Sequence, residues 1–168
     1  YPFTKRFFSI PQAILGVAFS MGIPMAFAAV RGEVPLIVAW LMLANFFWVL
    51  AFDTEYAMVD RDDDIRIGIR TSALFFGRFD VLAVAGCYAA FIAMMVLIGN
   101  AAGLGPIYYL GLTLAATLAL HHLWLIRDRD RMRCFAAFRG NNLFGMAVFV
   151  GVALDYAVRT GAWPRWYA

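Results

Sequence analysis

Charged residues are scarce in this sequence, and three long stretches contain none. Asp, Glu, Lys and Arg make up 15% of the 168 residues, whereas soluble proteins carry about a quarter. The stretches without charge are residues 7–30, 34–52 and 81–126. Apolar runs of about 18 or more residues are candidates for membrane-spanning helices. The mean hydropathy of the whole chain is +0.75. Together with the charge-free stretches, this value excludes an ordinary soluble domain and predicts an all-α, polytopic integral-membrane helical bundle.

Motifs typical of several other function classes are also missing. The two cysteines, Cys87 in an apolar run and Cys134 in a polar segment, have no metal or redox spacing, so we expect reduced thiols. There is no Gly-rich phosphate loop and no Ser/His/Asp nucleophile arrangement. A basic stripe interleaved with aromatic residues is absent as well, so nucleic acid is not an expected partner. We interpret the His121–His122 pair as interfacial packing rather than as metal ligands.

The amino-terminal residues show neither an initiating Met nor a signal peptide, because residues 1–6 have no apolar core region. We therefore expect the sequence to begin within a longer protein, and we expect the 168 residues alone to be inactive.

The apolar runs divide into five expected spans. A Gly-rich break at residues 99–106 splits the longest run, which is too long for one helix. The expected spans are residues 9–30, 34–52, 79–98, 106–126 and 143–158. Alternating crossings then place eleven of the fourteen Lys and Arg residues on one side, with the expected loops at 53–78 and 127–141. The positive-inside rule makes this side cytoplasmic.

An acidic segment directly follows the second expected span. If that helix continues, offsets of 7 and 11 residues bring Asp53, Asp60 and Asp64 to one face, with Tyr56 beside them. Three carboxylates on one face at a membrane edge repel one another and require a cation or basic partners. A solvated acidic loop is the plainer interpretation, but Asp53 and Tyr56 lie where an unpaired carboxylate is costly.

The donor chemistry of this segment indicates a hard cation. Oxygen ligands without His or Cys nearby favour Mg²⁺ or Ca²⁺ over Zn²⁺, and the spacing is not that of a calcium-binding loop. Mg²⁺ commonly bridges one or two carboxylates to substrate phosphates. Basic residues on the same side suit a diphosphate; they are Lys5, Arg6, Arg66 and Arg70.

Three segments resemble the UbiA-type intramembrane prenyltransferases, and most narrowly the 4-hydroxybenzoate polyprenyltransferases among them. They are YPFTKR at residues 1–6, DTEYAMVDRDDD at 53–64 and FRGNN at 138–142. The resemblance implies nine transmembrane helices around a central cavity, of which the five spans are the last five. It also implies one membrane domain over residues 1–168, in a bacterial or mitochondrial inner membrane, with its active site at the cytoplasmic face.

The same resemblance implies an activity and its residues. A polyprenyl group passes from polyprenyl diphosphate to the carbon ortho to the hydroxyl of 4-hydroxybenzoate, in ubiquinone biosynthesis, with Mg²⁺ as cofactor and membrane lipid as surroundings. Asp53, Asp60 and Asp64 are the implied catalytic residues, and Asp60 and Asp64 hold the metal with a first Asp motif that this sequence lacks. The implied substrate-binding residues are Tyr1, Lys5, Arg6, Tyr56, Arg66 and Arg70.

Three alternatives stay open at this point. A related prenyltransferase could use another acceptor, such as homogentisate, a naphthoate, haem or chlorophyllide. A cation-binding transporter would place its ionisable residues at mid-membrane rather than at one edge. A structural membrane subunit would leave the acidic segment without a purpose.

Overall fold

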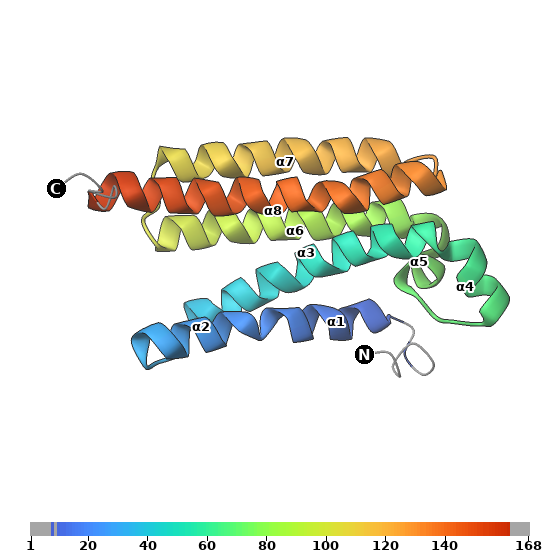
Figure 1. Cartoon of the computed structure of the whole chain (residues 1–168), viewed down its shortest axis with the longest axis horizontal. Coiled ribbons are helices and arrows are strands. Elements are labelled where there is room, and N and C mark those ends of the chain that lie inside the picture. The colour runs from blue at the N-terminus through green and yellow to red at the C-terminus, as the bar shows by residue number, and fades with distance from the viewer. Residues whose placement is uncertain (1–7, 9, 162–168) are drawn as a thin grey trace, which may run out of the picture.

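The computed structural model of the chain describes residue 8 and residues 10–161, and every regular element in this part of the chain is helical (Figure 1). The helices are α1 (Pro11–Ser20), α2 (Gly22–Arg31), α3 (Ile37–Val59), α4 (Arg61–Ile67), α5 (Ser72–Phe76), the short 3-10 helix η2 (Gly77–Phe79), α6 (Asp80–Ala101), α7 (Pro106–Ile126) and α8 (Arg131–Thr160).

Five segments are long and apolar enough to cross a membrane, which confirms the predicted number of spans. They are Pro11–Arg31, Ile37–Val59, Ser72–Ala101, Pro106–Ile126 and Arg131–Thr160. The first segment comprises α1 and α2, which are separated only by Met21. The chain is therefore an all-α, polytopic membrane bundle, as its charge-free runs predict.

The predicted boundaries are wrong at the polar segments. Residues 127–141 do not form a loop, because α8 begins at Arg131, where the side chain of Asp130 accepts a hydrogen bond from the backbone N–H of Arg133 at 2.9 Å. A buried helical face with Cys134 and Ala137 then holds this charged stretch against the bundle. Cys134 thus lies on a helix and is buried. Residues 53–78 are also largely helical, since α3 extends to Val59 and α4 and α5 follow.

Close contacts between small residues hold the bundle together. Helices α7 and α8 meet where Gly111 faces Gly151, and a Cβ at Gly111 would lie 2.6 Å from the carbonyl oxygen of Ala147. Helix α1 packs on α3, where the Asn45 side chain donates to Ser20 Oγ at 3.0 Å. Because lipid provides little hydrophobic driving force between helices, such small-residue contacts and interhelical hydrogen bonds supply the packing.

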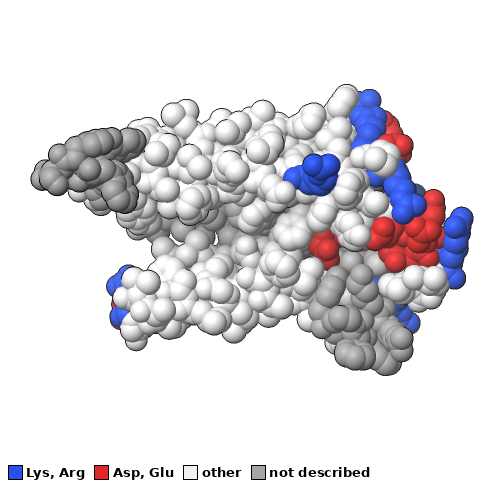
Figure 2. All heavy atoms as spheres, in the orientation of Figure 1, with Lys and Arg blue, Asp and Glu red and all other residues white. Residues whose placement is uncertain are grey.

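The end of the bundle that carries α4, α5 and the α7–α8 connection collects most of the visible charge. Figure 2 shows Lys, Arg, Asp and Glu concentrated there, whereas most of the length toward the other end is free of charge on this face. We refer to this as the charged end. It contains the acidic segment, so the fold places that segment at one edge of the apolar bundle.

Candidate functional site

The acidic segment contains a helix break. Helix α3 ends at Val59, and Asp60, with φ −92° and ψ 3°, separates it from α4. The predicted continuous helix face is therefore wrong. The break has a physical reason, because a continuous helix would leave several carboxylates near its negative carboxyl end. In the observed structure Asp62, Asp63 and Asp64 occupy the first turn of α4, where the positive helix end stabilises them.

Despite the break, the fold keeps the predicted catalytic carboxylates in one neighbourhood. The Tyr56 side chain is in electrostatic range of Asp53, Asp60 and Asp64, and Asp60 has the strongest influence on it. The backbone N–H of Asp64 donates to the carbonyl oxygen of Asp60 at 2.8 Å, which sets these two residues one helical turn apart on the same side. Tyr56 itself is 38% exposed, so the neighbourhood is accessible from outside the described chain.

The predicted substrate-binding residues are placed unevenly. Arg66 is exposed on α4 and lies 3.7 Å from Asp63, and Arg70 is exposed just after that helix. Tyr1, Lys5 and Arg6 lie outside the described residues. Within the described part of the chain, no group of three or more His, Cys, Asp or Glu residues is arranged to hold a metal ion.

A different carboxylate, Asp80, binds two arginines beside this neighbourhood. It is fully buried at the start of α6, and Arg61 Nη2 donates to its Oδ2 at 2.6 Å. Arg129 approaches from the α7–α8 connection and donates through Nη2 at 2.7 Å and Nε at 3.0 Å. These hydrogen bonds raise the pKa of Arg129 above its ordinary value. Sequence reasoning missed Asp80.

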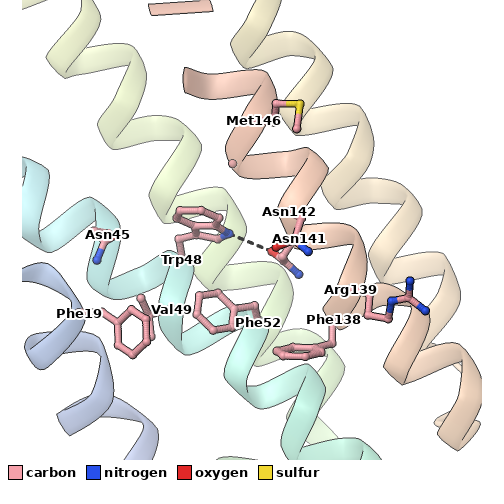
Figure 3. A pocket seen from close by; sticks show the side chains of 11 residues that line it. Phe19, Asn45, Trp48, Val49, Phe52, Phe138, Arg139, Asn141, Asn142 and Met146 are labelled. Atoms are coloured by element: carbon pink, nitrogen blue, oxygen red, sulfur yellow. Dashed lines mark hydrogen bonds between the residues drawn. The ribbon is translucent and has the colours of Figure 1, made fainter. Parts of the chain in front are cut away.

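A pocket of about 460 Å³ lies between α1, α3 and α8 (Figure 3). Most of its wall is aromatic or aliphatic, and the polar groups come from three asparagines and one arginine. The lining residues are Phe19, Asn45, Trp48, Val49, Phe52, Phe138, Arg139, Asn141, Asn142, Gly145 and Met146. Such a pocket suits a largely apolar ligand that carries few polar groups.

Aromatic contacts join the pocket to the carboxylates. The ring of Phe138 lies 6.2 Å from that of Phe52, also in the pocket wall, and 4.9 Å from that of Tyr56. Since Tyr56 is next to the three carboxylates, one wall leads from an acidic site into an apolar pocket. A molecule with a charged head and an apolar tail fits this arrangement, with its head at the acidic site and its tail in the apolar pocket.

Behind the pocket lies a buried polar cluster that the sequence did not reveal. The Tyr88 hydroxyl is 3.0 Å from Glu55 Oε1, from His122 Nδ1 and from Asn141 Oδ1. Asn141 also accepts a hydrogen bond from Trp48 Nε1 at 2.9 Å, and Figure 3 shows the Trp48 side chain of α3 pointing toward Asn141 on α8. We call Glu55, Tyr88, His122 and Asn141 the buried cluster.

The prediction for the histidine pair is thereby corrected in part. His122 is 1% exposed inside the bundle and belongs to the buried cluster. His121 is exposed and stacks on Trp124, with ring centroids 5.8 Å apart, as a residue at an interface would. Only Tyr88 and His122 gave a sequence signal, as polar side chains within expected apolar spans, because Glu55 and Asn141 fall in the expected loops at 53–78 and 127–141.

Comparisons with known proteins agree with this architecture. The profile of the UbiA prenyltransferase family matches residues 1–152. A 4-hydroxybenzoate octaprenyltransferase of Paraburkholderia phytofirmans is 64% identical over 157 residues, which cover 94% of this chain and 55% of that protein. One of Cupriavidus necator is 64% identical over 160 residues, covering 95% of this chain and 56% of the relative. The chain therefore spans about half the length of these relatives.

A solved structure shares the fold. The apo structure of a UbiA homolog from Aeropyrum pernix superposes with a TM-score of 0.74 at 24% sequence identity, covering 92% of this chain and 58% of that one. At this level of identity the likeness concerns the fold alone. The covered share agrees with the predicted five helices out of nine.

Proposed function

We propose that this chain, which belongs to the UbiA prenyltransferase family, forms part of a 4-hydroxybenzoate polyprenyltransferase. The whole enzyme would transfer a polyprenyl group from polyprenyl diphosphate to the ring carbon ortho to the hydroxyl of 4-hydroxybenzoate, in ubiquinone biosynthesis. Relatives with that acceptor in their names, at 64% identity, support the proposal. Because the chain spans about half of those relatives, we propose that residues 1–168 belong to one membrane domain and are inactive alone.

One observation carries the proposal: Tyr56, which lies among the three carboxylates, contacts Phe138 in the wall of an aromatic-lined pocket inside a membrane bundle. A polyprenyl diphosphate has the matching shape, with a charged head and a long apolar chain. The head would bind at the carboxylates through a cation, and the chain would follow the aromatic wall. An active site at the edge of the bundle would let the chain enter from membrane lipid.

The residues present fit Mg²⁺ as two ligands of a larger set. Asp60 and Asp64 offer oxygen donors one helical turn apart, the donor type that Mg²⁺ prefers. We propose that they hold the ion together with carboxylates from outside this chain. Bound Mg²⁺ would offset the charge of the diphosphate and make it a better leaving group. Asp53 would either share this role or orient the phenol of the acceptor.

The other residues of the chain would bind and shield the substrates. Phe52 and Phe138 exclude water from the allylic carbon, and their ring faces attract developing positive charge. The ring carbon of the acceptor would form the new C–C bond as the allylic C–O bond breaks and diphosphate departs with the bonding electrons. The ring proton would then pass to the departing diphosphate, which restores aromaticity. Basic groups would neutralise the charge of the diphosphate or the acceptor carboxylate, and phenolic groups would donate hydrogen bonds to them; the basic groups are Lys5, Arg6, Arg66 and Arg70, and the phenolic groups are Tyr1 and Tyr56.

The test uses the full-length protein in membranes, supplied with Mg²⁺, polyprenyl diphosphate and 4-hydroxybenzoate. We expect the 3-prenylated acid from the unchanged protein and a loss of at least about 100-fold for Asp60→Ala or Asp64→Ala. Asp62→Ala is the matched control, because Asp62 is an exposed neighbour on the same helix turn. Undiminished turnover in either variant, with insertion verified by immunodetection, contradicts the assignment.

The acceptor and the location need separate measurements. Competition between 4-hydroxybenzoate, homogentisate and naphthoates in the same membranes distinguishes the acceptors, and we expect 4-hydroxybenzoate to dominate. We further propose that the charged end faces the cytoplasm at an inner membrane, following the positive-inside rule. Labelling of a cysteine introduced at exposed Asp62 by an impermeant reagent would reveal the side.

A further inference from the structure

Asn141 uses every hydrogen-bonding position of its side chain within the protein. Its Oδ1 accepts from Trp48 Nε1 at 2.9 Å and from the Tyr88 hydroxyl at 3.0 Å. Its Nδ2 donates to Glu55 Oε2 at 2.8 Å and to the carbonyl oxygen of Ala137 at 3.2 Å. A carboxamide has two hydrogens and two acceptor lone pairs. Although Asn141 borders the pocket, it therefore has nothing left for a ligand, and its role is to hold its neighbours.

The contacts of Tyr88 determine which groups carry hydrogens. Its hydroxyl has one hydrogen but faces Glu55, His122 and Asn141, each at 3.0 Å. Since Asn141 Oδ1 is an acceptor only, all three contacts are favourable if Tyr88 donates to Asn141 and accepts from the other two. If Tyr88 instead donated to Glu55 Oε1, its oxygen and Asn141 Oδ1 would face each other as two acceptors. In the arrangement that avoids this, Glu55 Oε1 and His122 Nδ1 each carry a hydrogen. A glutamine at position 55 would offer the same donor and the same acceptor.

Burial makes this arrangement rigid. Glu55 is 0% exposed and His122 is 1% exposed, and the buried cluster joins α3, α6, α7 and α8. A buried polar group that loses its partner is costly, so the side chains are confined to the geometry in which all contacts are made. Gly140 allows His122 to lie directly against α8, because a Cβ there would come within 2.4 Å of His122 Nε2.

The indole of Trp48 is fixed from two directions. The buried cluster holds its Nε1 through Asn141, and the end of its six-membered ring lies over Gly145, where a Cβ would be 2.5 Å from Trp48 Cη2. The ring also contacts Phe52 at 5.9 Å and Phe144 at 5.6 Å between centroids. Trp48 is therefore a large aromatic surface in the pocket wall, held at one angle by its neighbours in that wall and, through Asn141, by Glu55 behind it.

We propose that Glu55 is a positioning residue which, through Asn141, holds the Trp48 indole in the pocket wall where it packs against the isoprenoid chain of the substrate. This inference rests on the proposed function for the identity of the occupant. The wall around Trp48 is apolar, with Val49, Phe52 and Met146, and matches a hydrocarbon chain better than a small polar acid. The position of the indole thus controls chain binding rather than the chemical step.

Kinetics of the full-length enzyme test the inference. We expect Trp48→Phe to raise the KM for polyprenyl diphosphate by roughly threefold to tenfold, because it removes the anchored indole, while the KM for 4-hydroxybenzoate changes little. Glu55→Leu, similar in size but without polar atoms, should produce the same change. Glu55→Gln should behave as the unchanged enzyme. The double variant Glu55→Leu/Trp48→Phe should be no worse than Trp48→Phe, since Glu55 acts through Trp48.

The inference is overturned if Glu55→Gln is as damaging as Glu55→Leu, or if the effects of Glu55→Leu and Trp48→Phe multiply. If Glu55→Leu is not recovered from membranes, Gly145→Ala displaces the indole by contact alone and should raise the same KM. An unchanged KM in both Gly145→Ala and Trp48→Phe also overturns the inference. These variants therefore give an answer even where the first one fails to fold.

A measurement without turnover separates this inference from the proposed function. Subtracting the fluorescence emission of Trp48→Phe from that of the unchanged protein isolates the Trp48 indole. Adding Trp48→Phe to each Glu55 variant allows the same subtraction in that variant. We expect the Trp48 emission obtained in this way to differ from that of the unchanged protein for Glu55→Leu and to match it for Glu55→Gln. Absence of any prenylated product from the unchanged enzyme would count against the function, whereas identical Trp48 emission in all three backgrounds would count against the positioning.

Discussion

Asp80 and Asp60 lie at the same charged end of the bundle, and the structure uses them in opposite ways. Asp80 is fully buried and receives hydrogen bonds from Arg61 and Arg129, which ties the start of α6 to two other segments. Asp60 lies between α3 and α4, and its side chain makes no capping hydrogen bond to the start of α4. It lies beside the accessible Tyr56. A carboxylate with arginine partners in the interior maintains the fold, whereas we propose that Asp60, beside a tyrosine that contacts the pocket wall, serves a ligand.

The largest expected effect tests the structural role of Asp80. Asp80→Ala leaves Arg61 and Arg129 facing each other without their common partner. Removing one member of a buried ion pair typically costs several kcal/mol, and both arginines are partly exposed. We expect the unfolding free energy to fall by about 3 kcal/mol, with activity lost in proportion to the folded protein. Thermal unfolding in detergent measures this, and an unchanged midpoint would show that the ion pairs contribute little.

The next prediction tests the proposed functional role of Asp60. Asp60→Asn keeps the size and polarity of the side chain but removes its charge, so a cation ligand is lost without a change in packing. We expect turnover to fall about 100-fold, equivalent to about 2.7 kcal/mol in the barrier, while the unfolding midpoint changes by less than about 2 °C. A parallel loss of stability and activity would instead assign Asp60 the same role as Asp80.

The fold was largely readable from the sequence because lipid imposes a simple rule. Five apolar stretches had to become helices, and the predicted number was confirmed. The boundaries failed where charge and helix coincide: Arg131 and Arg133 suggested a loop, but they lie on the exposed turns of a helix whose other face carries buried Cys134. Hydropathy averages over both faces of a helix, so it cannot detect a segment that is polar on only one.

The site was readable only in its local part. The acidic segment is contiguous in sequence, so Asp53, Asp60 and Asp64 could be singled out, although the break at Asp60 could not. Glu55 belongs to the same segment, but its partners are distant: Tyr88 is 33 residues away and Asn141 is 86. No local pattern encodes such contacts. They depend on how four helices pack, which local patterns in the sequence do not reveal.

A smaller expected effect tests how much the geometry of the contact between Arg129 and Asp80 matters. Arg129→Lys keeps the charge but loses the planar two-nitrogen contact with Asp80, so we expect a loss of about 1 kcal/mol in unfolding free energy. The raised pKa of Arg129 means that its contribution is complete at low and neutral pH and is lost only as pH rises through that folded-state value. Unfolding midpoints compared between pH 6 and 8 should therefore show the same difference for this variant.

The smallest expected effect concerns Asp63, which lies between the two cases. It receives a hydrogen bond from Arg131 at 3.0 Å and lies 3.7 Å from Arg66, but all three side chains are about half exposed or more. Exposed ion pairs contribute little and are screened by salt, so Asp63→Ala should cost about 0.5 kcal/mol and nothing measurable in about 1 M salt. Turnover should stay near that of the unchanged enzyme. A loss of turnover comparable to that of Asp60→Asn would add Asp63 to the functional carboxylates. A loss of unfolding free energy comparable to that of Asp80→Ala would show that burial does not distinguish the structural carboxylates from the others.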